Sequence, residues 1–140
     1  MLKSGMKLKI KHIGKVLILL VLIATASLSY AQSDVINNVK SAMKSGSSKE
    51  IAKFLSQNVD VTIDDDFQTY SKTQAEYALR DFFKKNVPDG FSIIHQGTSK
   101  GNLHFVIGQY TSNSNNFRVW LRMKDVSGRY LIHEISLTKE

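Results

Sequence analysis

The stretch from residue 91 to the C-terminus alternates apolar and polar side chains and is interrupted only by short turn-forming segments. Runs with this period of two predict antiparallel strands that direct one face at a core. We expect four strands joined by hairpins, at about Phe91–Thr98, Leu103–Thr111, Phe117–Lys124 and Tyr130–Thr138. This half of the chain therefore predicts an antiparallel sheet.

Two of the turns, "SKG" and "VSG", end in Gly101 and Gly128 and predict three-residue loops, because glycine adopts a left-handed backbone without steric cost. This register places two histidines, His95 and His133, among apolar side chains. The expected core face holds Phe91, Ile93, His95, Leu103, Phe105, Ile107, Phe117, Val119, Leu121, Met123, Leu131, His133, Ile135 and Leu137. The expected outer face holds His104, Tyr110, Arg118, Trp120, Arg122, Lys124, Tyr130 and Glu134.

Helices precede this sheet. Ser33 and Asp34 offer an N-cap for a first helix, which Gly46 ends. Ser47 with Glu50 three residues later forms the pattern of a capping box and predicts a short second helix.

A hairpin and a long helix lie between these helices and the sheet. Val59–Ile63 alternates as a strand, and Phe67–Tyr70 returns after a polar turn. Ser71 and Gln74 form a second capping-box pattern, which predicts a helix over about Lys72–Asn86 with a wide apolar stripe.

The N-terminus has the order of a secretory signal peptide. An apolar run, Val16–Ala24, follows a basic segment and precedes small residues at Ser29 and Ala31. We expect cleavage after Ala31, a single domain over residues 32–140 and a location in the periplasm or outside the cell. An uncleaved membrane anchor is the alternative. The basic segment contains Lys3, Lys7, Lys9, Lys11 and Lys15.

Removal of this segment changes the charge. The whole chain has 19 Lys and Arg against 12 Asp and Glu, a formal charge of +7. Five of the lysines lie in the expected signal peptide, so the mature chain is nearly balanced at +2. We therefore expect no nucleic-acid partner, and membrane contact only through the signal peptide. The chain has no cysteine, which excludes disulfides and thiol chemistry.

His95 has two interpretations. It is either a hydrogen-bonded core histidine or a polar group on the floor of an apolar pocket, where it would orient a small ligand. The predicted ligand-binding residues are His95, His133, Phe91, Phe105 and Leu121. The two histidines lie three strands apart, about 14 Å at ordinary strand spacing, so we expect no metal and no cofactor.

Several segments resemble a known family. "YSKTQAEYALRDFF", "GFSIIHQGTSKGNLHFVIGQYTS" and "FRVWLRMKD" are similar to small exported bacterial proteins described as a domain of unknown function. The resemblance implies an α+β, cystatin-like or nuclear-transport-factor-two-like cone, in which helices pack on a curved antiparallel sheet, often around a cavity. It implies no reaction.

Two functions from different classes remain. The leading hypothesis is a non-enzymatic module that binds a small apolar ligand or a protein. The alternative is an isomerase- or cyclase-like enzyme, for which His95 and Asp64 are the weak candidates for proton transfer.

The outer face is the predicted partner interface, because arginine and tryptophan are enriched at binding hot spots. Its proposed contact residues are Arg118, Trp120, Arg122 and Tyr110. A homodimer or an envelope protein partner is expected there, and an ordinary solvated face is the alternative.

Overall fold

The computed structural model describes residues 2–140, with the side chains of residues 12–22 and 34–140. The chain divides into two compact units, Met1–Ser33 and Asp34–Glu140. Helix α1 (Leu2–Ser45) runs through the boundary, so the predicted helix start at Ser33 and Asp34 is wrong. In the uncleaved chain the helix continues from the residues before this position, so no N–H groups of a first turn need a cap there.

In the first unit, the described side chains after Lys15 are all apolar. Val16 to Leu22 are each 55–64% exposed. The basic residues before His12 and the expected cleavage residues, Ser29 and Ala31, lie outside the side chains that the structure describes. Among the described residues, no helix is long and apolar enough to cross a membrane.

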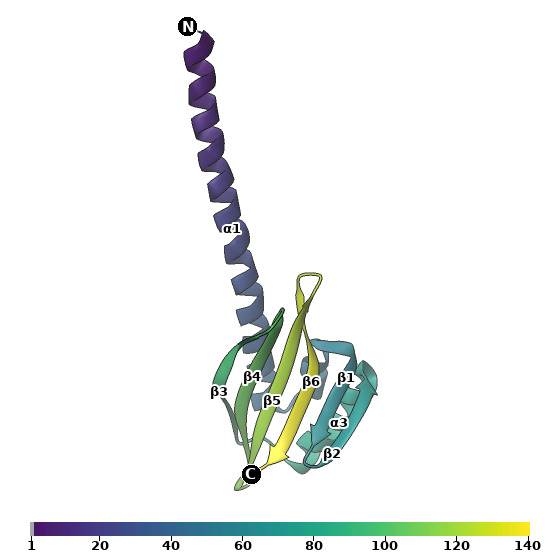
Figure 1. The fold of residues 1–140 in the computed structure, drawn as a ribbon. Helices are drawn as coiled ribbons and strands as arrows, with labels where there is room; N and C mark the ends of the chain where they lie inside the picture. Colours follow the sequence, from purple (N-terminus) through teal and green to yellow (C-terminus); the bar gives the residue numbers. More distant parts are fainter. Residues whose placement is uncertain (1) are drawn as a thin grey trace. The chain divides into compact units, whose positions relative to one another are not determined.

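The second unit packs helices against one face of a curved six-stranded sheet, as the α+β prediction requires (Figure 1). The strand order is β2-β1-β6-β5-β4-β3, and β1 and β6 are the one parallel pair among neighbours that are otherwise antiparallel. Its further elements are α2 (Ser48–Ala52), β1 (Leu55–Ile63), β2 (Asp66–Ser71), α3 (Lys72–Lys85), β3 (Gly90–Ser99), β4 (Leu103–Ser112), β5 (Asn115–Val126) and β6 (Arg129–Lys139).

The other two predicted N-caps, Ser47 and Ser71, are present. The Ser47 hydroxyl accepts a hydrogen bond from the Glu50 N–H at 3.3 Å and begins α2. At α3 the capping box is complete, because Ser71 Oγ accepts from the Gln74 N–H while Gln74 Oε1 accepts from the Ser71 N–H at 3.0 Å.

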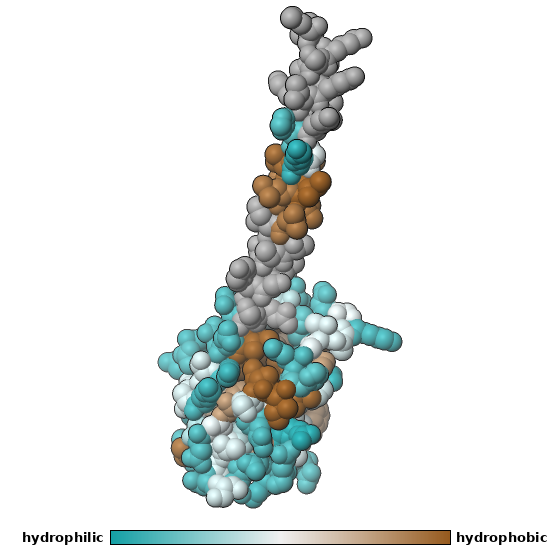
Figure 2. Space-filling model, turned by 90° about the vertical axis from the view of Figure 1, so that its left-hand side faces the viewer, coloured by the Kyte–Doolittle hydropathy of each residue, from teal (hydrophilic) through white to brown (hydrophobic). Residues whose placement is uncertain are grey.

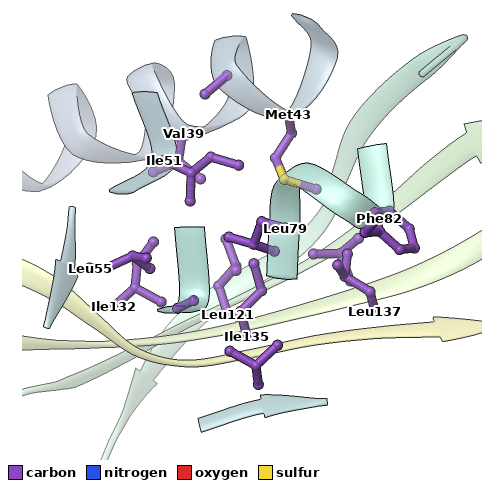
Figure 3. Packing of buried hydrophobic residues seen from close by; sticks show 14 of the residues in the cluster. Val39, Met43, Ile51, Leu55, Leu79, Phe82, Leu121, Ile132, Ile135 and Leu137 are labelled. Carbon is purple, nitrogen blue, oxygen red and sulfur yellow. The ribbon is translucent and has the colours of Figure 1, made fainter. Parts of the chain in front are cut away.

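The core lies between the helices and the sheet. Side chains of α1, α2 and α3 meet those of β1, β5 and β6 in one apolar layer (Figure 3). Its fully buried members include Met43, Ile51, Leu79, Leu121 and Ile135. The opposite face of the sheet, turned toward the viewer in Figure 1, carries no helix within residues 34–140; we call it the outer face.

The predicted register of the β3–β4 hairpin is wrong. Ser99 pairs with Leu103, so the loop is shifted by one residue from the expected position. A bulge between Ile93 and His95 then returns the first half of β3 to its expected face. The cause is packing at Gly108, where an added Cβ would lie 2.5 Å from the Phe91 ring. Only a glycine that faces inward leaves room for this ring.

The β5–β6 turn also differs from the prediction. Val126 pairs with Arg129, which leaves a two-residue loop of Ser127 and Gly128 with φ of 53° and 82°. Two positive φ values are typical of a type I′ turn. A bulge at His133 then brings Ile135 back to the core.

Several residues lie on the face opposite to the predicted one. The one-residue shift at the β5–β6 turn reverses the start of β6, the bulge in β3 reverses His95, and the pairing of β4 with β5, which sets Tyr110 opposite Phe117, reverses β4. His95, Phe105 and His133, predicted in the core, lie on the outer face. Tyr110, predicted at the partner interface, is fully buried in the core. The other residues on the face opposite to the predicted one are Leu103, Ile107, Leu131, His104 and Tyr130.

Candidate functional site

The outer face is made by alternate residues of β3 to β6. Direct cross-strand neighbours there are Ile107 with Trp120, and Phe105 with Arg122. On the other side of β5, Arg122 lies opposite Glu134. The predicted placement of Arg118, Trp120, Arg122 and Lys124 on this face is confirmed by their pairing and by the burial of the residues between them.

Three aromatic rings form a row across this face. The ring centroids of His95 and Phe105 are 5.6 Å apart, and those of Phe105 and Trp120 are 5.5 Å apart with planes 3° from parallel. Gly97 lies beneath Phe105, because an added Cβ would approach this ring to 2.9 Å. The row therefore lies flat on the sheet and joins the edge strand β3 to the central strand β5. We call it the aromatic row.

Charged residues flank the aromatic row. Arg118 pairs with Glu140 at 2.7 Å and Arg122 with Glu134 at 3.2 Å, with all four side chains at least 31% exposed. Exposed pairs of this kind contribute less than about 1 kcal/mol to stability. These pairs hold basic groups along β5, and acidic groups on β6 and at Glu140 directly after it.

His133 occupies the bulge in β6. Its Nε2 atom is buried and has no hydrogen-bond partner. Burial lowers the pKa of His133 below its ordinary value, Lys124 lowers it further, and Asp60 opposes both. The neutral imidazole is therefore favoured on this face.

The predicted ligand-binding residues are not brought together. Phe91 and Leu121 line a cavity between α1 and the sheet, whereas His95, Phe105 and His133 lie on the opposite face. The volume of this cavity is about 10 Å³. That is the space of about one water molecule, far below the several hundred Å³ of a typical ligand pocket.

The two candidates for proton transfer are also separated. Asp64 lies in the β1–β2 turn, and His95 lies on β3 at the other edge of the sheet. The Asp64 carboxylate accepts a hydrogen bond from the Lys139 N–H at 2.9 Å, which ties the turn to the end of β6. Asp64 also borders a surface hollow of about 300 Å³ beside Asp81, Lys85 and Lys139. Within residues 34–140 these four side chains form no ion pair with one another.

The sequence reasoning missed the part that Phe105 and Ile107 have in this face, whereas Glu134 lies there as predicted. Glycines within the strands could have indicated which residues share a face, since Gly97 and Gly108 each lie close to an aromatic ring. In the part of the chain with described side chains, no three His, Cys, Asp or Glu residues lie close enough to hold a metal ion.

Comparison with known proteins identifies relatives of the second unit. The model of a family described as a domain of unknown function (DUF4783) matches residues 36–138. Crystal structures of DUF4783 proteins from Bacteroides uniformis and Bacteroides ovatus are similar, with 33% and 36% identity and TM-scores of 0.71 and 0.70. Each match covers 74% of this chain, and 95% and 93% of the respective relative.

A more distant likeness shows the fold alone. An NTF2-like protein of unknown function from Silicibacter pomeroyi matches with 11% identity and a TM-score of 0.61, over 83% of this chain and 98% of its own. The search of curated proteins finds no match. The expected nuclear-transport-factor-two-like fold is therefore confirmed.

Proposed function

The chain belongs to the DUF4783 family, and we propose that it is an exported, non-enzymatic binding module whose outer face holds a second copy of the same chain. The observation that carries this proposal is the aromatic row, which joins His95, Phe105 and Trp120 on a sheet face that no helix of residues 34–140 covers. Aromatic and arginine side chains at the centre of a flat face are typical of protein interfaces.

The charges of the outer face favour a second copy over an unrelated partner. Arg118 and Arg122 form a basic line on β5, while Glu134 and Glu140 form an acidic line beside it. In a two-fold pair the same surface serves both subunits, so the basic line of one copy can lie over the acidic line of the other. Such a surface is complementary to itself in charge and apolar at its centre.

The small cavity argues against the other binding mode. A drug-sized ligand needs several hundred Å³, and the space lined by Phe91 and Leu121 is about 10 Å³. The buried rings of Phe82, Phe83 and Phe117 fill the cone together with Tyr110. A protein partner on the outer face needs no such space.

Export is supported by the first unit. The side chains of Val16 to Leu22 are more than half exposed and present no polar face, as in the apolar region of a signal peptide. A chain without cysteine is also stable to the redox conditions outside the cytoplasm. We therefore place the mature protein in the bacterial envelope or beyond it.

The proposal is tested by sedimentation velocity on the processed chain. The wild type is expected to be a dimer, and Trp120→Glu to be a folded monomer, because a carboxylate would be buried at the centre of the interface. Phe67→Glu is the matched control, since Phe67 is 57% exposed on the edge strand β2, away from the aromatic row. It should leave the dimer intact.

Two results would contradict the proposal. A wild type that stays monomeric at all concentrations excludes a second copy and leaves a different protein as the partner. A dimer that persists in Trp120→Glu, with circular dichroism unchanged, places the interface elsewhere.

A further inference from the structure

Two stretches of the second unit contain no acidic residue. Neither residues 35–49 nor residues 90–124 contain Asp or Glu, although they contain seven Lys and Arg residues. These ranges form the end of α1 and the strands β3, β4 and most of β5. In contrast, residues 60–81, which form the end of β1, all of β2 and most of α3, contain six acidic side chains. The small net charge of the domain therefore hides a strong asymmetry.

An apolar groove lies between the end of α1 and β3. Ile36 and Val39 of α1 face Phe91 and Ile93 of β3 across it, and Lys40 stands at its border. Figure 2 shows a continuous hydrophobic area on the side of this unit that holds β3. The groove is distinct from the outer face, since its residues belong to the core side of the sheet.

Ile94 follows Ile93, which lines this groove, and its aliphatic side chain is exposed. It is the extra residue of the β3 bulge and is 59% exposed. Lys40 and Lys44 follow Ile36 at intervals of four residues on α1, so the three share one side of the helix. No ion pair among the described residues involves Lys40, Lys44 or Lys100.

We infer that the side of the unit around this groove, which we call the lipid face, docks on an anionic phospholipid bilayer. Unpaired lysines beside an exposed isoleucine and the rim of an apolar groove fit the surface of such a membrane. The groove is too small to receive a partner's side chain, but a bilayer needs only a shallow apolar surface with basic residues at its border.

The test is flotation of the processed chain with vesicles of phosphatidylcholine, with and without phosphatidylglycerol. The Bacteroides relatives crystallised as chains that match the second unit almost over their whole length, so this unit folds alone in those proteins. Binding is expected only to the anionic vesicles, and it should weaken as salt screens the lysines.

Two substitutions separate the apolar and the charged contributions. Ile94→Asp should weaken binding at least about tenfold, because the isoleucine side chain, exposed in the free protein, would be buried in the bilayer on binding. Lys40→Gln and Lys44→Gln should each weaken it about fivefold. The matched controls are Phe67→Asp, at 57% exposure, and Lys84→Gln on α3, and both should bind as the wild type does.

The inference is overturned if the protein does not float with anionic vesicles, or if Ile94→Asp and Phe67→Asp bind equally. It is also overturned if Ile94→Asp abolishes an association between protein molecules in the absence of vesicles, since the lipid face would then be a protein interface. Trp120→Glu should still float, so a failure of the dimer proposal and a failure of this inference are distinguishable.

Discussion

Phe105 and Trp120 lie on neighbouring strands with their rings 3° from parallel and their centroids 5.5 Å apart. Neither ring reaches the core, because both point to the side of the sheet that no helix covers in residues 34–140. Two large aromatic side chains at this position cover one another but leave part of their surface in water. The outer face is therefore the natural place for a second molecule to bury them.

Tyr110 contributes to stability through its hydroxyl group. The ring is fully buried among Phe82, Phe83 and Phe117, and the O–H donates a hydrogen bond to the Asn86 carbonyl at the end of α3. Tyr110→Phe leaves this carbonyl without its partner, so we expect a loss of about 1–2 kcal/mol in the free energy of unfolding. Urea unfolding measures it. Tyr77→Phe, at an exposed position, should change nothing, and equal effects would contradict this account.

Two strand glycines should differ in their tolerance of alanine. A Cβ at Gly108 would lie 2.5 Å from the buried Phe91 ring and 3.0 Å from the Ser92 carbonyl oxygen. A Cβ at Gly97 would meet only the Phe105 ring, which lies on the outer face and can move. We expect Gly108→Ala to cost about 1–3 kcal/mol and Gly97→Ala clearly less. The reverse order in urea unfolding would argue against this packing.

The β5–β6 turn can be improved. Ser127 adopts φ of 53° ahead of Gly128 at 82°, the conformation that Asn-Gly prefers in type I′ turns. Ser127→Asn is expected to raise the free energy of unfolding by about 0.5 kcal/mol. Gly128→Ala should lower it, because alanine has strain at this φ. Thermal unfolding of both variants tests the turn, and a destabilising Ser127→Asn would refute the two-residue loop.

Stability should fall as the pH is lowered from about 7 to 5. Burial lowers the pKa of His104 and of His133 in the folded protein, and Asp125 and Asp60 only partly oppose this. The unfolded chain, with ordinary histidines near pKa 6.5, then takes up protons that the folded chain does not. Urea midpoints across this range measure the slope. His133→Gln should reduce it, and a midpoint that rises toward acid would contradict the assignment.

Most secondary structure was predictable because its signals are local. The capping residues Ser47, Ser71 and Gln74 fixed the starts of α2 and α3, and glycines marked both long hairpins. Alternation located all four strands of the second half within a few residues. The family resemblance supplied the arrangement of these elements, and the matching family and NTF2-like structures confirm it.

The faces of β3, β4 and β6 were not predictable by the same reasoning. Bulges at Ile94 and His133 insert one residue each, and a bulge leaves no local pattern of its own in an alternating strand. Tertiary packing decided the register, because Gly108 had to lie beneath Phe91. The candidate site also differs from the prediction, since the extra residue of the β3 bulge moves His95 from the expected core face to the outer face.

Cross-linking through an introduced cysteine tests the central proposal most directly. The chain has no cysteine of its own, so Ile107→Cys provides a single thiol beside Trp120 on the outer face. With a short bis-maleimide we expect a covalent dimer in high yield, and little from Tyr77→Cys on the exposed side of α3. Equal yields from the two positions, or none from Ile107→Cys in a sample that sediments as a dimer, would show that the outer face does not join two copies.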